Sequence, residues 1–463
     1  MSFWDLPDSR KTALVREDAA PLSYRELLAQ VMEVEAMVFA DTRHALGMLF
    51  FDSSVFDIGV YLASLRSANP ALLLNASMDP SLAGGLIEHY RPAWILAPKS
   101  LSLPACYGAA LAGEAKALYL RKDSVFSTCH PELALLLTTS GSTGSPKLVR
   151  LSRGALQANA ESIRSYLGIQ SDTVAVTSLP LFYSYGLSVL NSHLLAEASI
   201  GLTSRSLLDK VFYAQLKDWR VTSLAGVPFH YKTLVKTGFF RDDWPDINTL
   251  TQAGGRLDAR DKQLVHEYAR QKQKRFYVMY GQTEATARMC YVPPAQLGDK
   301  LDSIGIPIPD GKMECDRQTG ELVYQGPNVM MGYATRKEHL LEGDVNRGVL
   351  HTGDIGRIDD DGYFYVMGRE SRFIKLAGQR LALDDIEQKL AGEFHCNIVA
   401  VGDDDSLKLV LEAADHELSG SVEQRVKTLF GLSPSLYKVC LVDHLPIKDN
   451  GKLDLPLLRG MCA

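Results

Sequence analysis

Hydroxyl-bearing residues and two glycines precede a single lysine in the stretch TTSGSTGSPK, residues 138–147. Glycine has no Cβ atom, so backbone N–H groups beside it can approach an anion closely. The hydroxyls of Ser140, Ser142 and Thr143 supply further donors, and Lys147 supplies a positive charge. This composition is suited to holding a phosphate group.

The spacing of this stretch differs from the two common phosphate-binding fingerprints. Lys147 stands three residues after Gly144, with Pro146 between them, so the G-x-x-x-x-G-K-[ST] pattern of a Walker A loop is absent. The G-x-G-x-x-G pattern of dinucleotide-binding folds is absent from it as well. Taken alone, the stretch fits a flexible Ser/Gly connector equally well, and other motifs must decide between the two interpretations.

Four further polar motifs follow the loop in the sequence. They are YGQTE (280–284), HTGD (351–354), GRESRFIKLAG (368–378) and DNGK (449–452). Each has an ordinary structural interpretation, because YGQTE fits the end of a strand, HTGD fits a turn and Asn450-Gly451 is a strong hairpin-turn pair. The occurrence of all four in this order is not explained in that way.

In this order the motifs resemble those of the adenylate-forming (AMP-binding) superfamily, which comprises acyl- and aryl-CoA synthetases, adenylation domains of nonribosomal peptide synthetases, and luciferases. The resemblance covers nearly the whole chain and extends to LPLFYSYG, SLAGVP, QAGGRL and GELVYQGPNVMMGY. It implies that a carboxylic acid attacks the α-phosphorus of ATP, that pyrophosphate leaves, and that a thiol then displaces AMP. The implied acceptor is coenzyme A or the phosphopantetheine arm of an acyl or peptidyl carrier protein.

The resemblance also implies which residues bind ATP. The loop would surround the β- and γ-phosphates with Thr139, Ser140, Gly141, Ser142, Thr143, Gly144 and Lys147. Adenine would lie beside Tyr280, Gly254 and Gly255, and the α-phosphate near Gly281, Gln282 and Thr283. The ribose would contact Asp354 and Arg369, since a carboxylate is a suitable acceptor for two hydroxyl groups.

Four positions are implied to act in catalysis or in the motion between half-reactions. Glu284 would bind Mg²⁺, a cation that prefers carboxylate oxygen, and Thr283 would assist at the α-phosphate. Lys452 would stabilise negative charge in the transition state of adenylation. Ser371 would be the hinge of a mobile C-terminal domain.

The resemblance also implies which residues line the pocket for the carboxylic acid. Its expected lining is Tyr183, Tyr185, Gly186, Phe229, His230, Gly281 and Thr286, with Met289 deeper. The region lacks the Phe-Asp pair with which amino-acid-activating domains hold an ammonium group, and burying an unpaired ammonium is unfavourable. An acyl or aryl acid is therefore favoured over an amino acid.

Other functions stay open at this point. A stand-alone amino-acid adenylating enzyme that loads a carrier protein is one alternative, and a catalytically silent AMP-binding protein is another. A luciferase-like oxidase is a third. Basic residues available for the 3′-phosphate of coenzyme A are Arg372, Lys375, Arg380 and Lys448.

The sequence departs from the family pattern at three positions. Ser371 stands where family members commonly carry Asp or Lys, and Leu148 stands where glycine is common. Tyr183 occupies the position of a histidine that gates the acid pocket in many acyl- and aryl-CoA ligases. None of these departures removes a catalytic group.

The elements that must position these motifs alternate between strands and helices. ALGMLFF and AWILAP are typical of buried strands, SVFDIGVYLASLRS between them has helical spacing, and Ser23 with Glu26 predicts a capping box. Such alternation favours an α/β fold whose parallel-rich sheets are flanked by helices. After about Leu301 short strands predict a β-rich subdomain, and from Ser371 a smaller α+β domain follows. We therefore expect an adenylation core over 1–370 and a mobile domain carrying Lys452 over 371–463.

The composition limits the partners and the compartment of the protein. The 463 residues carry a net charge of −6, which argues against nucleic-acid binding. There is no apolar run of 18 residues and no basic flank with an apolar segment at the start, so neither a membrane span nor a signal peptide is expected. Seven scattered cysteines without a C-x-x-C pair predict neither a zinc site nor a disulfide framework. A cytoplasmic enzyme is expected.

Overall fold

The computed structural model describes residues 1–17, 19–138, 147–369, 372–376, 379–403, 406–413, 416–430, 432–448 and 453–461. The chain divides into two compact units. The first comprises Met1–Leu301, Gly305–Lys312 and Tyr324–Leu350, and the second comprises Asp302–Ile304, Met313–Val323 and His351–Ala463. The boundary expected between residues 370 and 371 falls inside the second unit and stays a prediction.

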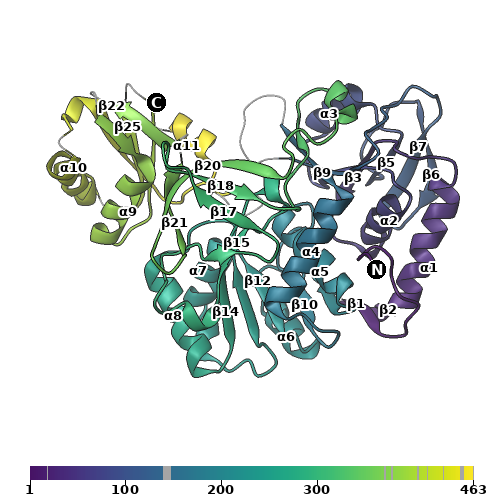
Figure 1. Cartoon of the computed structure of the whole chain (residues 1–463), viewed down its shortest axis with the longest axis horizontal. Coiled ribbons are helices and arrows are strands. Elements are labelled where there is room, and N and C mark those ends of the chain that lie inside the picture. The colour runs from purple at the N-terminus through teal and green to yellow at the C-terminus, as the bar shows by residue number, and fades with distance from the viewer. Residues whose placement is uncertain are drawn as a thin grey trace. The chain divides into compact units, whose positions relative to one another are not determined.

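The first unit contains an eight-stranded sheet near the N-terminus (Figure 1). Its order is β19 (Gly332–Ala334), β9 (Leu148–Ser152), β8 (Leu133–Thr138), β4 (Ala71–Asn75), β3 (Gly47–Phe51), β5 (Trp94–Pro98), β7 (Lys116–Arg121), β6 (Tyr107–Ala112). The four strands from β8 to β5 are parallel, so their carboxyl ends share one edge. Thr138, the last residue before the glycine-rich stretch, lies at that edge.

A nine-stranded sheet forms the rest of the first unit. Its order is β16 (Ile306–Pro307), β15 (Cys290–Val292), β14 (Arg275–Tyr280), β13 (Thr249–Gln252), β12 (Ser223–Gly226), β10 (Val174–Val176), β11 (Ser199–Leu202), β1 (Thr12–Arg16), β2 (Ala19–Ser23). The strands from β14 to β1 are parallel, and β15, β16 and β2 are antiparallel additions. Parallel strands of this kind need helical crossovers, which the sequence supplies.

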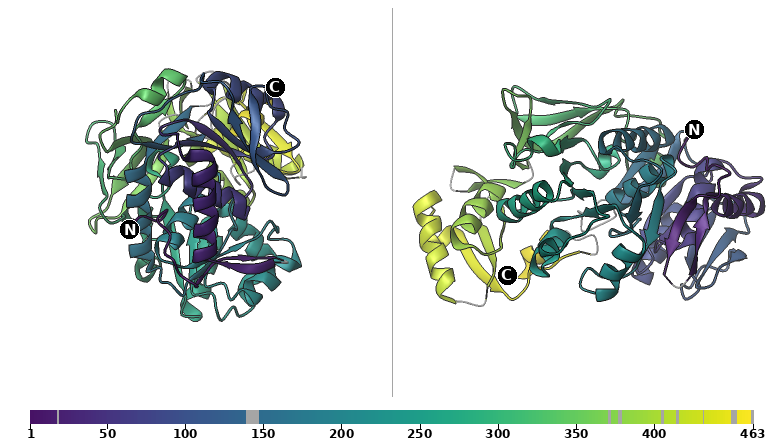
Figure 2. Two further views of the ribbon diagram at one scale, coloured as in Figure 1. Left: turned by 90° about the vertical axis from the view of Figure 1, so that its right-hand side faces the viewer. Right: turned by 90° about the horizontal axis from the view of Figure 1, so that it is seen from below.

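The α-helices of the first unit are α1 (Tyr24–Val34), α2 (Val55–Arg66), α3 (Pro80–Tyr90), α4 (Arg153–Leu167), α5 (Ser184–Leu195), α6 (Lys210–Asp218), α7 (Pro228–Lys236) and α8 (Ala259–Gln271). Most of them begin at a residue whose side chain caps them, whereas α5 and α7 have no side-chain cap. The predicted capping box of Ser23 and Glu26 is confirmed at α1, and Ser54 caps α2. Helices α4 and α5 pack against each other (Figures 1 and 2).

The second unit holds most of a four-stranded sheet and a small α+β part. The four-stranded sheet has the order β17 (Lys312–Cys315), β18 (Glu321–Gln325), β20 (Val349–Ile358), β21 (Phe364–Arg369). The α+β part contains β22 (Phe373–Leu376), β23 (Gln379–Ala382), α9 (Leu383–Phe394), β24 (Ile398–Gly402), β25 (Leu407–Glu412), α10 (His416–Phe430), β26 (Tyr437–Val442) and α11 (Leu455–Met461). Helices α9 and α10 share a core with one face of β24–β26, while Leu458 of α11 packs on the other face.

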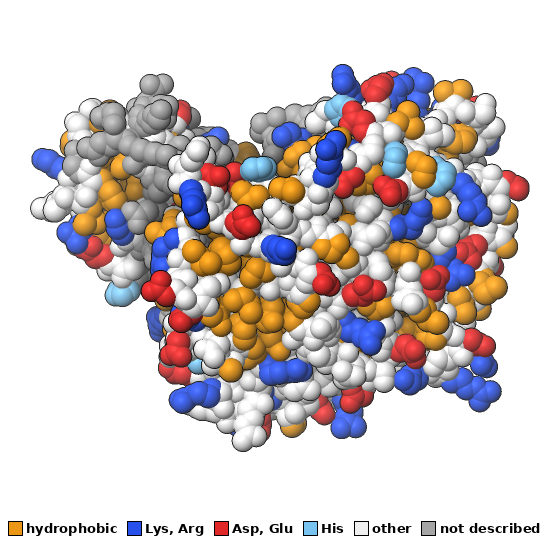
Figure 3. Space-filling view, viewed as in Figure 1, with side chains coloured by type: hydrophobic (Ala, Val, Ile, Leu, Met, Phe, Trp, Pro, Cys, Tyr) orange, Lys and Arg blue, Asp and Glu red, His pale blue; other side chains and the backbone are white. Residues whose placement is uncertain are grey.

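The predicted fold class, a parallel-rich α/β core with a β-rich region and a small α+β part, is confirmed by these elements. Within the described residues, no helix is both long enough and apolar enough to cross a membrane. Acidic and basic side chains alternate over the face shown in Figure 3. Cys440 is disulfide-bonded, which the cysteine spacing did not predict.

Candidate active site

The polar motifs of the first unit converge because each directly follows a parallel strand. SLAGVP ends β12, QAGGRL follows β13, and YGQTE follows β14, and these three strands are neighbours in the nine-stranded sheet. Carboxyl ends of neighbouring parallel strands meet at one edge, where open α/β sheets bind their ligands. The predicted residues of these three motifs therefore share one edge of the nine-stranded sheet.

Gly254 and Tyr183 meet at this edge. Gly254 has a φ of +82°, and a Cβ atom there would lie 2.6 Å from the phenol oxygen of Tyr183. Gly255 is held by Gln252, whose Nε2 donates to the Gly255 carbonyl at 2.9 Å. The two predicted glycines thus leave backbone without side chains beside Tyr183, the N-cap residue of α5. Any larger residue at position 254 would displace Tyr183.

The YGQTE motif forms a tight turn after β14. Thr283–Ala285 is a single turn of 3-10 helix, and the next two residues, Thr286 and Ala287, have positive φ angles of 57° and 99°. A Cβ atom at Gly281 would lie 1.8 Å from the carbonyl oxygen of Ala287, so only glycine fits there. The turn is fixed from the other side by the N–H of Met330, which donates to the Glu284 carbonyl.

Glu284, the predicted magnesium ligand, is connected to Lys147 through a tyrosine. The phenol of Tyr333 donates to Glu284 Oε1 at 2.9 Å, and Lys147 Nζ lies 4.8 Å from the centre of the Tyr333 ring. Burial raises the pKa of the Tyr333 phenol, and the Glu284 carboxylate raises it further, so the phenol remains a donor. The carboxylate and the ammonium group of two separate motifs are therefore organised by one side chain.

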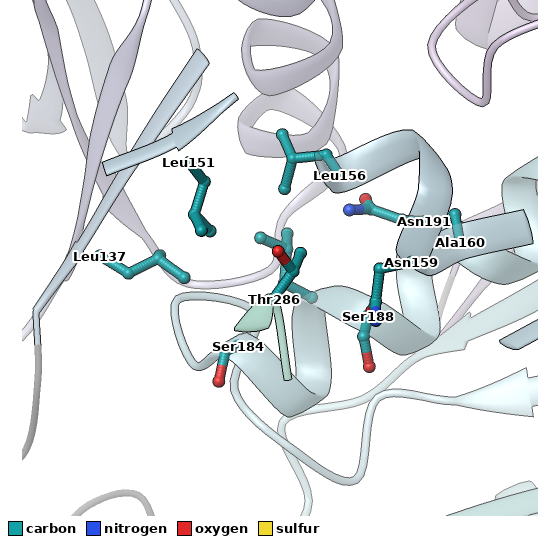
Figure 4. Close-up of a pocket in the computed structure, with 10 residues that line it drawn as sticks. Leu137, Leu151, Leu156, Asn159, Ala160, Ser184, Ser188, Asn191 and Thr286 are labelled. Atoms are coloured by element: carbon teal, nitrogen blue, oxygen red, sulfur yellow. The ribbon is translucent and has the colours of Figure 1, made fainter. Parts of the chain in front are cut away.

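Ser184 and Thr286 contribute polar atoms to the lining of a small cavity in the first unit (Figure 4). Ser184 Oγ and Thr283 Oγ1 are 3.1 Å apart, and the Thr286 hydroxyl donates to the Asn328 carbonyl at 2.7 Å. Ser184 and Thr286 line this cavity together with Asn159 and Asn191, among others. The structure thus brings the predicted α-phosphate residue Thr283 within hydrogen-bond distance of the start of α5.

The remaining predicted pocket residues lie on two helices, α5 and α7. Tyr185 is buried in α5 and its phenol donates to the Thr251 carbonyl, while a Cβ atom at Gly186 would lie 2.2 Å from the Pro180 carbonyl oxygen. At the start of α7, Phe229 is 43 % exposed. Burial lowers the pKa of its neighbour His230 to about 4, so this imidazole is neutral at pH 7.

Two further predicted positions frame the turn. Met289 is fully buried and its N–H donates to the Tyr280 carbonyl. The amide of Gln282 donates to the Tyr280 phenol at 3.4 Å, a long hydrogen bond. These contacts fix Tyr280 at the end of β14, where the adenine was expected.

In the second unit, the structure brings Asp354 and Arg369 together. They are paired across the antiparallel strands β20 and β21, and Arg369 Nε donates to Asp354 Oδ1 at 2.7 Å. Asp354 is 1 % exposed, and the Arg369 guanidinium supplies a charged hydrogen-bond partner for this buried carboxylate. Both predicted ribose ligands therefore belong to one cluster.

Glu321 organises the HTGD motif and was not predicted from the sequence. Its Oε1 accepts the N–H of Gly353 at 2.9 Å and its Oε2 lies 2.9 Å from His351 Nδ1. The hydroxyl of Thr352 donates to the neighbouring Leu322 carbonyl. The turn before Asp354 is therefore fixed by β18, which is 30 residues away in sequence.

Arg372, one of the basic residues considered for the 3′-phosphate of coenzyme A, is already paired. Its guanidinium contacts Asp384 at 2.5 Å and also Glu387, and its side chain is 15 % exposed. Burial raises the pKa of Glu387 to about 7, and the Arg372 charge opposes this shift. A side chain held by two carboxylates in this way is poorly suited to bind a phosphate.

Several predicted residues lie outside the described part of the chain. They are Thr139, Ser140, Gly141, Ser142, Thr143, Gly144, Ser371 and Lys452. Their roles stay predictions.

Comparison with known proteins identifies the family. A family model described as AMP-binding enzyme matches residues 7–334. The chain belongs to the AMP-binding enzyme family. The loop at 138–147, YGQTE and QAGGRL all lie inside the matched region.

Curated relatives of this AMP-binding enzyme include two coenzyme A ligases. A feruloyl-CoA synthase from Amycolatopsis sp. is 29 % identical over 271 residues, and a 2-succinylbenzoate–CoA ligase from Bacillus cytotoxicus is 30 % identical over 267 residues. Each match covers 56 % of this chain and 54 % of the relative, so the chain spans about half the length of the curated relatives it matches.

A solved structure matches over almost the full chain. It is the o-succinylbenzoate coenzyme A synthetase from Bacillus subtilis in complex with its acyl-adenylate intermediate, with a TM-score of 0.78, 22 % identity, and coverage of 99 % of this chain and 98 % of that one. At this identity the match shows the fold of the AMP-binding enzyme and no more.

The residues that the structure describes suit ATP and Mg²⁺. A protein usually supplies only one or two carboxylates to Mg²⁺, because phosphate and water oxygens provide the other ligands. Glu284 can serve as such a carboxylate. The glycines at 254, 255 and 281 leave no Cβ atoms at the edge where a nucleotide would approach. Tyr333 and Glu321 lie in the stretch GELVYQGPNVMMGY that the resemblance included, but no role was predicted for either; each is identified only by its partner in the structure.

Proposed function

We propose that this AMP-binding enzyme activates a carboxylic acid with ATP and transfers the acyl group to coenzyme A. In the first step a carboxylate oxygen attacks the α-phosphorus, the bond to the β-phosphate oxygen breaks, and pyrophosphate leaves. In the second step the thiol sulfur attacks the acyl carbon, AMP leaves with the bridging oxygen, and the thiol proton passes to solvent.

The observation that carries this proposal is the contact chain from Lys147 through Tyr333 to Glu284. It unites a cation and a carboxylate of two motifs that the family uses around phosphates, and phosphoryl transfer depends mainly on such positioning and charge neutralisation. Glu284 would bind Mg²⁺, Thr283 would contact the α-phosphate, and Asp354 with Arg369 would bind the ribose. Lys452 would stabilise the transition state.

Coenzyme A is favoured as acceptor because both named relatives are coenzyme A ligases. An acyl or aryl acid is favoured because the pocket positions Tyr183, Tyr185 and Thr286 carry no carboxylate that could pair with an ammonium group. Transfer to a carrier protein remains the alternative second step. Comparing thioester formation with coenzyme A and with a phosphopantetheinylated carrier protein distinguishes the two acceptors.

Acid-dependent exchange of pyrophosphate into ATP tests the first step. The purified chain is assayed with Mg²⁺ and a panel of aliphatic, aromatic and amino acids, without a thiol. Exchange with aliphatic or aromatic acids is expected. Exchange with amino acids alone would contradict the assigned acid class, and absence of exchange with every acid, in a protein shown to bind ATP, would contradict the proposed activity.

A further inference from the structure

Arg288 is a buried arginine that adjoins residues predicted to line the acid pocket. It is 1 % exposed and follows Thr286 by two residues. Its Cα atom would lie 2.7 Å from a Cβ atom at Gly281, and its guanidinium carbon lies 5.0 Å from the centre of the Tyr185 ring. Three residues predicted to line the pocket therefore adjoin it.

The guanidinium of Arg288 has few acceptors. Its Nη1 donates to the phenol oxygen of Tyr166 at 3.2 Å and lies 3.6 Å from Met279 Sδ, while its Nε has no partner. The Tyr166 phenol itself donates to the same sulfur at 3.1 Å. A thioether is a weak acceptor, so two strong donors share one weak acceptor. Among the residues that the structure describes, no carboxylate forms an ion pair with Arg288.

Arg150 shows how this chain satisfies a buried arginine elsewhere. It is 0 % exposed, and its terminal nitrogens donate to the carbonyls of Met331, Glu342 and Gly343. The Glu342 carboxylate lies 3.7 Å away. In both arginines Nε has no hydrogen-bond partner, but the terminal nitrogens of Arg150 donate to three backbone carbonyls, whereas Nη1 of Arg288 donates to one phenol and one thioether.

The positive charge of Arg288 influences the pKa of two neighbouring side chains. Burial lowers the pKa of His193 to about 4, and the Arg288 charge contributes to this lowering. Burial raises the pKa of Tyr185 to about 12, and the Arg288 charge opposes that rise. Both effects are those of a positive charge close to the two side chains.

We propose that Arg288 determines substrate specificity by binding a second carboxylate of the acid, so that the enzyme prefers dicarboxylic acids. This inference rests on the proposed function and deepens it. A buried unpaired cation is unfavourable, and a planar carboxylate can accept two parallel hydrogen bonds from a guanidinium. The distal carboxylate would supply the strong acceptor that Arg288 and Tyr166 lack.

The test compares matched pairs of acids in pyrophosphate exchange. Each pair is a dicarboxylic acid and the monocarboxylic acid in which a methyl group replaces the second carboxylate, over a series of straight-chain and aromatic skeletons. We expect kcat/KM to favour the dicarboxylic member by about 10–100-fold for the skeletons that fit, the range for a hydrogen bond to a charged group. Exchange with monocarboxylic acids but no such preference overturns the inference and leaves the proposed function standing.

Variants identify the residue responsible. Arg288→Met is expected to abolish the preference by lowering kcat/KM for the dicarboxylic acid alone, and Arg288→Lys, which keeps the charge without the planar fork, is expected to retain part of it. The control Arg150→Lys is expected to lower the melting temperature without changing the ratio between paired acids. An unchanged ratio in both Arg288 variants overturns the inference.

A binding measurement keeps the inference testable without turnover. The melting temperature of the wild-type chain with ATP is recorded in the presence of each acid of a pair. A larger increase with the dicarboxylic member is expected, and equal shifts across all pairs overturn the inference. Absence of exchange with every acid would refute the proposed function instead.

Discussion

Replacing Tyr333 by phenylalanine tests whether this residue positions the magnesium ligand. The change removes only the phenol oxygen, which donates to Glu284 Oε1 at 2.9 Å. The aromatic ring stays, and with it the contact to Lys147 Nζ at 4.8 Å. Tyr333→Phe therefore separates the hydrogen bond to the carboxylate from the cation–π contact, which Tyr333→Leu removes as well.

The size of the effect follows from the kind of contact. A hydrogen bond to a charged acceptor contributes about 1.5–3 kcal/mol. Loss of a residue that orients a metal ligand typically lowers metal affinity or activity by about 10–100-fold. We therefore expect Tyr333→Phe to raise the Mg²⁺ concentration for half-maximal pyrophosphate exchange by a factor in this range, at saturating ATP and acid. Tyr333→Leu should show a larger loss.

Tyr213→Phe is the matched control. The Tyr213 phenol donates to the Leu207 carbonyl at 2.6 Å, and its partners include no carboxylate. This variant should lose some stability to urea but keep the wild-type Mg²⁺ midpoint. If Tyr333→Phe also keeps the wild-type midpoint while folding normally, the hydrogen bond does not position a magnesium ligand and the reasoning fails.

Three other predictions concern separate parts of the chain. Lys452→Ala should lower the rate of adenylation by about 10²–10³-fold while ATP affinity, measured by calorimetry, stays close to wild type; an unchanged rate would remove Lys452 from the mechanism. Lys116→Met should lower the free energy of unfolding by about 3–5 kcal/mol in urea titrations. The reason is that Lys116 Nζ contacts the fully buried Asp57 at 2.7 Å, and burial raises the pKa of that carboxyl to about 7. A stability equal to wild type would contradict the role of this pair. Burial lowers the pKa of His193 to about 4 from an ordinary value of 6.5, so between these values the unfolded chain binds the proton and the folded chain does not. Wild type should therefore lose up to about 3 kcal/mol through this group as the pH falls from 6.5 to 4, His193→Gln should lack this part of the pH dependence, and identical pH profiles would refute the assignment.

Strong local patterns made much of the fold predictable. The buried strand and helix expected from ALGMLFF and SVFDIGVYLASLRS correspond to β3 and α2. The start of α5 at Ser184 was less predictable, because a glycine stands in its first turn. Gly186 resembles a helix breaker in sequence, but the close approach of the Pro180 carbonyl requires a residue without Cβ inside the first turn.

The motif residues of the site were predictable because their types are dictated by chemistry close to a ligand. Gly254, Gly281 and Glu284 each stand directly after a parallel strand, where sequence order alone predicts proximity. Tyr333 and Glu321 were not predictable in this way. Tyr333 contacts a carboxylate 49 positions away and Glu321 contacts a histidine 30 positions away. Both residues belong to the stretch GELVYQGPNVMMGY, but the sequence does not indicate which distant side chains they contact.

The hydrogen-bond partners of Arg288 could not be predicted from the sequence. Arg150 and Arg288 both lie close to phosphate-loop or magnesium-ligand motifs in sequence, and both are buried, so composition and spacing treat them alike. They differ in the partners that folding brings to them. Arg150 contacts three backbone carbonyls and a carboxylate, whereas Arg288 contacts a phenol and a thioether. A buried guanidinium with strong acceptors stabilises the fold, whereas one without them has binding capacity left for an anion. We therefore expect the acid specificity of this enzyme to depend on buried polar groups that lack strong hydrogen-bond partners. The motifs determine only the chemistry that the family has in common.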